Sequence, residues 1–195
     1  MRQILIVYGT TDGQTRKIAN VLAEDLRARR CSVDLVDAAG PLHRLSPETY
    51  DAVIVGASVH IGAFQKSVVR WVRENANVLK KIQTAFLPVC LAILETRPEA
   101  RQEIDKIVER FFRQSGWRPS VTKPLAGALR YTQYSWLKKW MMKRIVAKAG
   151  GDTDTTRDHE YTDWNELRVF AGEFVARLAT REIMTGAEVM AGGVV

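Results

Sequence analysis

Hydrophobic residues along the chain occur in short continuous runs, separated by stretches with helical periodicity. The runs predict five β-strands, at residues 3–8, 32–36, 52–56, 85–91 and 121–129. The periodic stretches predict helices at residues 14–29, 65–79, 98–114 and 162–180. Three of the strands are almost entirely Val, Ile, Leu and Ala. Because helices connect these apolar strands, we expect an α/β doubly wound parallel sheet with helices on both faces.

The loop after the first predicted strand, GTTDGQT, leads directly into a predicted helix. Its hydroxyl groups, its close-approach glycine and the helix N-terminus favour a bound phosphate. The candidate ligands are Thr10, Thr11, Asp12, Gly13, Gln14 and Thr15. The loop lacks the Gly-Lys-Ser/Thr sequence of triphosphate-binding loops and the three spaced glycines of dinucleotide sites. A purely structural alternative is that Thr11 or Asp12 caps the helix.

Two further loops follow the third and fourth predicted strands and should share the same edge of the sheet. Small residues and glycines in them let main chain approach a flat ring. The candidates are Ala57, Ser58, Val59, His60, Ile61, Gly62, Cys90, Leu91 and Ala92. One phosphate loop and two loops suited to an apolar ring predict a flavin mononucleotide (FMN) site.

Histidines offer few candidates for chemistry. His60 could lie against the flavin ring, meet an acidic substrate, or simply be a solvent-exposed loop residue. His43 and His159 show no partner pattern, and we expect both at the surface.

The length of 195 residues and the 46% hydrophobic content favour a single domain, at residues 1–181. Residues 182–195 contain three glycines and are expected to form a C-terminal tail, for which flexibility is one interpretation. Cys31 and Cys90 form no metal-type cluster, which favours free thiols in the cytoplasm and no bound metal. We expect no secretory signal, and the longest uncharged apolar stretch, residues 84–94, is too short to span a bilayer.

Residues 117–151 contain eight basic residues and no acidic one, whereas the rest of the chain is nearly neutral. Aromatic and basic side chains together suit an anionic membrane surface, although the helical wheel of residues 136–148 does not separate into two clean faces. The segment could instead be a lid whose cations meet substrate carboxylates, or a solvated helix packed on the sheet. Nucleic acid is the weakest alternative, because no recognition motif accompanies the charge.

Several motifs resemble a known family. TTDGQT resembles the phosphate loop of flavodoxins, and residues 1–178 resemble the flavodoxin-like, menaquinone-dependent protoporphyrinogen oxidases of bacterial haem synthesis. The motifs that carry this resemblance are GWRP at 116–119, GALRY at 127–131, AGGDTDT at 149–155 and YTDW at 161–164. The resemblance implies that an insertion at about 129–158 splits the fifth strand, as in long-chain flavodoxins.

In its second loop the chain has His60 and Ile61 where familiar members carry a basic and then an aromatic residue. An aromatic cover for the flavin is therefore expected from Tyr131, Tyr134 or Trp136. The residues that we expect to contact substrate or membrane are Arg130, Tyr131, Tyr134, Trp136, Lys139, Trp140, Lys143 and Arg144.

The resemblance also implies a function: FMN-dependent oxidation of protoporphyrinogen IX, with electrons passed to menaquinone or another membrane quinone. It implies a cytoplasmic protein at the inner face of the cell membrane, and a peptide near Gly62 that reorients when the flavin is reduced. No residue is identified as a general acid or base. The alternative is an FMN-binding electron carrier without a substrate of its own, a role that usually goes with an acidic surface. A signalling receiver is disfavoured, because the acidic cluster expected after the first strand is missing.

Overall fold

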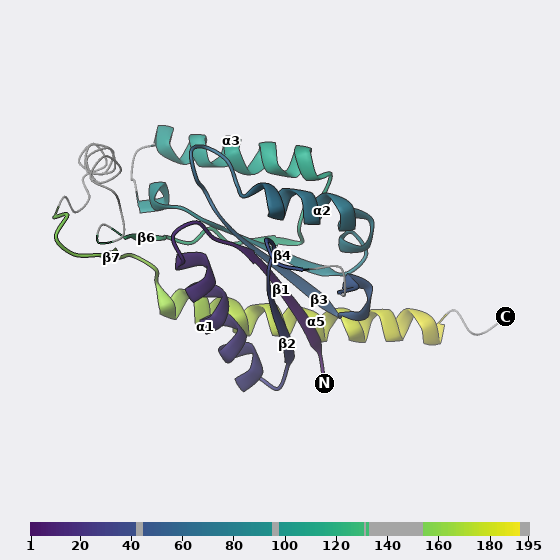
Figure 1. Ribbon diagram of the computed structural model, residues 1–195. Helices are drawn as coiled ribbons and strands as arrows, with labels where there is room; N and C mark the ends of the chain where they lie inside the picture. Colours follow the sequence, from purple (N-terminus) through teal and green to yellow (C-terminus); the bar gives the residue numbers. More distant parts are fainter. Residues whose placement is uncertain (42–44, 95–97, 131, 133–153, 192–195) are drawn as a thin grey trace.

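The fold is a parallel sheet between two layers of helices (Figure 1). The computed structural model describes residues 1–41, 45–94, 98–130, 132 and 154–191. The five-stranded sheet has the order β2-β1-β3-β4-β5. Its strands are β1 (Gln3–Gly9), β2 (Ser32–Asp37), β3 (Ala52–Ser58), β4 (Gln83–Val89) and β5 (Val121–Thr122). The α-helices are α1 (Gln14–Ala28), α2 (Lys66–Leu79), α3 (Pro98–Ser115) and α5 (Trp164–Ala191), and the 3-10 turns are η1 (Pro47–Thr49) and η2 (Leu91–Leu94).

Each face of the sheet packs against a different pair of helices. In β1, Ile4 and Ile6 belong to the core that contains α1 and α5, whereas Leu5 and Val7 belong to the core that contains α2 and α3. All four side chains are at most 1% exposed. Burial on both faces explains why the strand is a continuous apolar run, and it confirms the predicted doubly wound fold.

The fifth strand is shorter than the predicted strand at 121–129. Only Val121–Thr122 pair with β4, and Leu125 makes one further bridge to Val89. Lys123 N–H still donates to Phe86 O of β4, but Pro88 has no N–H to donate to Lys123 O, which explains why the regular pairing stops there. Beyond Leu125 the chain leaves the sheet.

The insertion predicted at about 129–158 is flanked by a small antiparallel ribbon. β6 (Ala128–Leu129) pairs with β7 (His159–Glu160), in a sheet separate from the main one. We call β6, β7 and the adjoining residues 130 and 161–162 the stem. The segment after the insertion therefore pairs with β6 and not, among the described residues, with the main sheet.

The last helix is longer than predicted. α5 begins at Trp164 and continues to Ala191, eleven residues past the expected end at residue 180. A glycine inside a helix costs only about 1 kcal/mol relative to Ala, so Gly186 does not end it, and residues 182–191 continue α5. None of the helices in the described part of the chain is long and apolar enough to cross a membrane.

Candidate functional site

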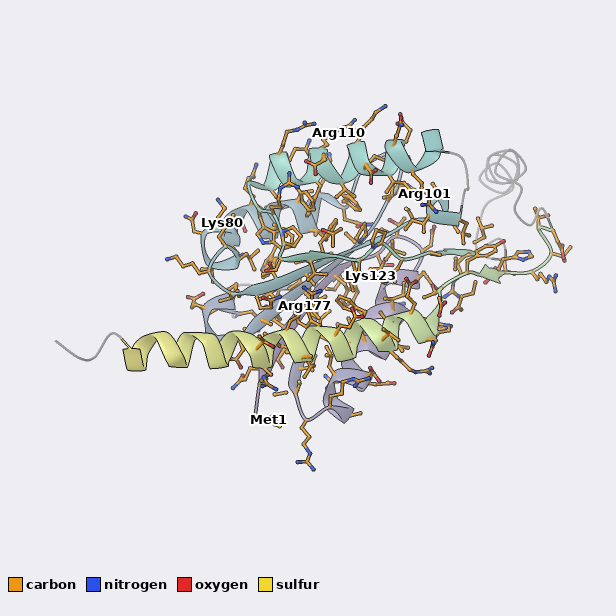
Figure 2. The ribbon with its side chains drawn as sticks, turned by 180° about the vertical axis from the view of Figure 1, so that it is seen from behind. Met1, Lys80, Arg101, Arg110, Lys123 and Arg177 are labelled. Carbon is orange, nitrogen blue, oxygen red and sulfur yellow. The ribbon has the colours of Figure 1, made fainter. Side chains whose placement is uncertain are left out.

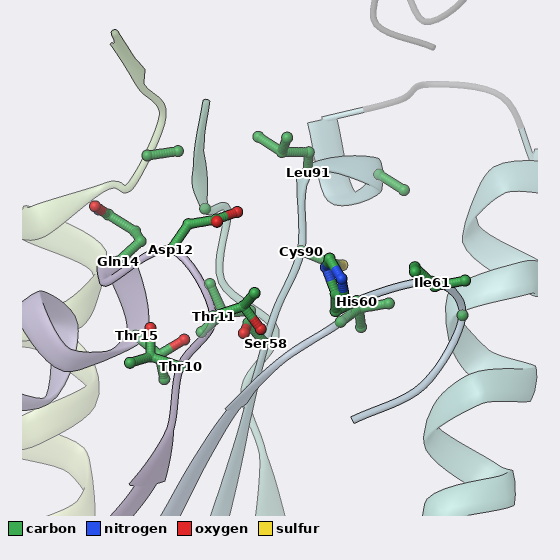
Figure 3. A pocket seen from close by; sticks show the side chains of 16 residues that line it. Thr10, Thr11, Asp12, Gln14, Thr15, Ser58, His60, Ile61, Cys90 and Leu91 are labelled. Atoms are coloured by element: carbon green, nitrogen blue, oxygen red, sulfur yellow. The ribbon is translucent and has the colours of Figure 1, made fainter. Parts of the chain in front are cut away.

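A cavity of about 420 Å³ opens at the carboxyl edge of the sheet, where the loops after β1, β3 and β4 meet (Figure 3). β1 lies between β2 and β3, so the direction of chain progression reverses between β1 and β3. Such a switch point is where doubly wound sheets place ligands. The predicted residues that line the cavity are Thr10, Thr11, Asp12, Gln14, Thr15, Ser58, Val59, His60, Ile61, Gly62, Cys90, Leu91 and Ala92.

Two of the predicted cofactor-binding residues, Gly13 and Ala57, do not line this cavity. Gly13 lines an adjoining cavity of about 740 Å³ on the other side of the first loop, together with Arg16, Lys17 and Arg130. Ala57 is fully buried in β3 and packs in the core that contains α2 and α3. Ala57 therefore contributes to the site through the position of its backbone in β3 and not through its side chain.

The first loop is held by its own hydrogen bonds. The Gly13 N–H donates to Thr10 Oγ1 at 2.9 Å, and Gly13 has a left-handed backbone with φ of 87°. Gly13 is the N-cap of α1 and there is no side-chain cap. The alternative in which Thr11 or Asp12 caps the helix is therefore wrong, because glycine occupies the capping position and leaves these side chains at the cavity.

One hydroxyl of the GTTDGQT sequence has no partner among the described residues. Thr15 Oγ1 is buried and makes no hydrogen bond to any described residue, and the residue is 1% exposed. A buried polar atom normally has a partner, so this oxygen marks a place for a ligand atom.

The second loop ends in a tight turn at the lip of the cavity. His60 and Ala63 exchange two backbone hydrogen bonds, of 2.8 and 3.2 Å. Between them Ile61 and Gly62 both have positive φ, of 49° and 69°. Glycine adopts this conformation freely, whereas a β-branched residue is strained in it. The Ile61 side chain is 88% exposed, so its packing offsets little of this strain.

The third loop continues β4 into η2 and contributes Cys90, Leu91 and Ala92 to the cavity. The Cys90 N–H donates to Leu125 O at 3.0 Å, which ties this loop to the chain that leaves β5. Burial raises the pKa of the Cys90 thiol to about 11. The thiol therefore stays protonated near neutral pH.

Sequence reasoning missed several residues of this region. Val89, Gly127 and Ala128 line the cavity, although they were assigned to a strand or to the family motif GALRY. Gln65 lies behind the loops, with Nε2 3.1 Å from Thr11 Oγ1 and 2.6 Å from Ser58 Oγ. No local pattern marks Gln65, because Thr11 is 54 positions away in the chain.

The stem is fastened to the start of α1. Gln14 Nε2 donates to Thr162 Oγ1 at 2.9 Å, and Arg130 Nη2 donates to Gln14 Oε1 at 3.4 Å. Lys17 Nζ lies 2.6 Å from a carboxylate oxygen of Glu160. Both ends of the insertion therefore contact the helix that begins at the predicted phosphate loop.

Of the residues expected to contact substrate or membrane, the structure describes Arg130. Its side chain is 26% exposed, and Nη1 lies 3.9 Å from Asp158. Tyr131, Tyr134, Trp136, Lys139, Trp140, Lys143 and Arg144 lie outside the described residues.

The expectation that His159 is a surface residue is wrong. It is 8% exposed, its Nε2 lies 2.8 Å from Asp154 O, and its ring stacks on Tyr161 at 6.4 Å between centroids. Its position in β7 buries it, a placement that no local pattern in the sequence indicated. His43 lies outside the described residues.

The cavity fits the predicted cofactor. The unpartnered Thr15 hydroxyl, the Thr10 and Thr11 hydroxyls and the N-terminus of α1 suit a phosphate. The described residues that line the cavity include no Lys or Arg, so the donors to the phosphate would be hydroxyl and backbone groups. Val59, Ile61, Leu91 and Ala92 give the other side an apolar lining suited to a flat ring.

Solved structures with the same architecture include flavodoxins. Flavodoxin 2 from Bacillus cereus has a TM-score of 0.54 and 18% identity, covering 90% of this chain and 99% of that one. The Streptococcus pneumoniae TIGR4 flavodoxin has a TM-score of 0.54 and 16% identity, with the same coverage of both chains. At these identities the likeness shows the fold.

Sequence comparison relates the chain to proteins of higher identity than these solved structures. The family model described as flavodoxin domain matches residues 5–156. Protoporphyrinogen IX dehydrogenase (quinone) of Escherichia coli strain K12 is 36% identical over 173 residues, which cover 87% of this chain and 92% of the relative. The protein of the same name from Leishmania major is 32% identical, with 88% of this chain and 74% of the relative covered.

These relationships confirm FMN as the cofactor that the three loops predicted and an oxidoreductase as the class of protein. The chain belongs to the flavodoxin domain family and, within it, to the family of the quinone-dependent protoporphyrinogen IX dehydrogenases.

Proposed function

We propose that this protein oxidises protoporphyrinogen IX to protoporphyrin IX with bound FMN and passes the electrons to a quinone, which is reduced to the quinol. The observation that carries the proposal is the relationship to the Escherichia coli dehydrogenase, which extends over 92% of that protein. A protein that was only an electron carrier would share the flavodoxin fold. Nothing would require it to match nearly the whole length of this dehydrogenase. When bound, FMN supplies the redox chemistry in this reaction.

The protein's own residues would bind and orient the groups that react. Thr10, Thr11 and Thr15 would donate to the phosphate, while Val59 and Leu91 would exclude water beside the ring. His60 lines the same cavity and is exposed at its lip, where it could meet a carboxylate of the substrate. No residue is assigned as a general acid or base.

The finer proposal is that menaquinone is the acceptor and that the protein works at the inner face of the cell membrane. The basic character of residues 117–151 supports the membrane location, since each Lys or Arg near anionic headgroups is worth roughly 1 kcal/mol. Arg130, in the stem, would lie where this segment meets the cofactor site.

The test of the oxidation is anaerobic turnover by the purified protein. Its visible spectrum is recorded first, and protoporphyrinogen IX is then added with and without menadione while porphyrin fluorescence is followed. We expect a flavin spectrum and fluorescence that depends on menadione. A flavin spectrum without any quinone-dependent fluorescence would favour the electron carrier. Replacing menadione by a ubiquinone analogue tests the choice of quinone.

The membrane proposal has a separate test, flotation with anionic and with neutral vesicles. A variant with Lys139, Lys143 and Arg144 changed to Glu should lose anionic flotation. The matched control changes Lys80, Arg101 and Arg110 to Glu, which alters the net charge equally on the side of α2 and α3 (Figure 2). Equal loss in both variants would mean that net charge, and not this segment, determines binding.

A further inference from the structure

Gln65, which was not among the predicted site residues and does not line the cavity, connects the first two loops. It is the residue before α2, and its side-chain amide lies between Thr11 of the first loop and Ser58 at the end of β3. Both hydroxyls line the cavity and lie close together there (Figure 3). Gln65 therefore contacts two residues that line the cavity without lining it itself.

The amide donates one hydrogen bond to each hydroxyl. Its Nε2 is 3.1 Å from Thr11 Oγ1 and 2.6 Å from Ser58 Oγ, and an amide nitrogen has two hydrogens to give. Its Oε1 is buried and has no partner among the described residues. The opposite orientation of the amide would instead leave two N–H groups unpaired, and a carbonyl without a donor is the more readily tolerated of the two.

This arrangement determines whether each hydroxyl can donate a hydrogen bond to a ligand. A hydroxyl has one hydrogen, and when its oxygen accepts a bond from Gln65 that hydrogen stays available for another acceptor. The same holds for Thr10, whose Oγ1 accepts from the Gly13 N–H. Three hydroxyls at the cavity are therefore left as donors, in a site whose described lining has no Lys or Arg.

We propose that Gln65 is a positioning residue that fixes the hydroxyls of Thr11 and Ser58 as donors and thereby makes the cavity selective for the phosphate of FMN. A phosphate accepts hydrogen bonds and cannot return them in its dianionic form, so it needs a site made of donors. The proposal rests on FMN being the cofactor, and it does not depend on which substrate the flavin oxidises.

Two variants separate the polarity of the amide from its shape. Gln65→Glu keeps the shape but turns the donor into a carboxylate, which would take the hydrogens of Thr11 and Ser58 and repel the phosphate. Gln65→Met keeps similar length and removes both hydrogen bonds. The matched control is Gln102→Glu, the same chemical change on the exposed side of α3.

The experiment titrates the full-length, flavin-stripped protein with FMN and with riboflavin, following flavin fluorescence. We expect Gln65→Glu to weaken FMN at least about tenfold, as for loss of hydrogen bonds to a charged group. Gln65→Met should lose less. Riboflavin, which lacks the phosphate, should change less than about twofold in both variants. Gln102→Glu should leave both affinities unchanged.

Two results would overturn the proposal. If Gln65→Glu bound FMN as tightly as the unchanged protein, the amide would be acting as an acceptor. If FMN and riboflavin weakened by the same factor, Gln65 would shape the loop without selecting the phosphate. A thermal melt of each stripped variant identifies one that has failed to fold, and Thr11→Val then tests the donor hydroxyl directly, with the same phosphate-specific loss expected. Because no turnover is measured, the outcome is independent of whether the protein oxidises protoporphyrinogen.

Discussion

Gln14 and Thr162 are 148 positions apart and share a buried hydrogen bond of 2.9 Å. Gln14 is the first residue of α1, and Thr162 belongs to the stem, after the insertion. Thr162 Oγ1 also donates to Ala126 O at 2.8 Å, on the approach to β6. One hydroxyl thus joins the first loop to both sides of the insertion.

The first prediction concerns this hydroxyl. Thr162→Val keeps the shape of the side chain but leaves the buried Gln14 amide and the Ala126 carbonyl without this partner. We expect the free energy of unfolding to fall by about 1–3 kcal/mol, as measured by urea denaturation.

The control is Thr180→Val, which removes an exposed hydroxyl bonded to Ala176 O within α5. We expect it to change stability by less than about 0.5 kcal/mol. Equal losses in the two variants would show that the bond between Gln14 and Thr162 contributes nothing specific.

The second prediction concerns the strained turn at Ile61. An L-residue in the left-handed conformation costs roughly 1–2 kcal/mol, and Asn visits it more readily. The Ile61 side chain gains little in return, because it is 88% exposed. We therefore expect Ile61→Asn to raise the free energy of unfolding by about 0.5–1 kcal/mol.

The matched control for this turn is Leu94→Asn. Leu94 is another exposed apolar residue, at 47%, and it does not have a positive φ. The same change there should bring no stabilisation. If both variants gained the same stability, the cause would be the loss of an exposed apolar side chain and not relief of backbone strain.

A feature could be predicted from the sequence when the residues that determine it lie close together along the chain. Strands such as β3 were predictable because burial on both faces leaves a continuous apolar run. The first loop was predictable because its donors and its glycine are adjacent in the chain. Gln65 and Thr162 were not, because their partners are brought to them by the fold, across 54 and 148 positions.

The third prediction concerns the thiols. Burial raises the pKa of both Cys31 and Cys90, that of Cys90 from 9.0 to about 11. A raised pKa means less thiolate at any given pH, and the thiolate is the reactive form. Neither cysteine of the folded protein should react with a disulfide reagent at about pH 8, whereas both should react in urea. Rapid reaction of one thiol in the folded protein would contradict this, and Cys90→Ser would identify which one.

The last prediction concerns stability at high pH and rests on Tyr50 and Asp34. Tyr50 is 8% exposed, and its hydroxyl donates to Asp34 Oδ2 at 2.6 Å. The pKa of Tyr50 is raised from 10.0 to about 12. Burial is the largest cause, and the hydrogen bond to Asp34 and the negative charge of Asp34 add to it. Because the folded state holds this proton more tightly than the unfolded state, the contribution is complete below pH 10 and is lost as the pH rises toward 12.

Tyr50→Phe should therefore lower the free energy of unfolding by about 1–2 kcal/mol near neutral pH and make it less dependent on pH above about 10. Urea denaturation at about pH 8 and about pH 11 measures both effects. Asp34→Asn is the matched variant, since it keeps an acceptor for the hydroxyl but removes the charge, so it should flatten the pH dependence only in part. If the unchanged protein and Tyr50→Phe lost the same stability between these pH values, other groups, including Tyr8 with its raised pKa, would account for the dependence.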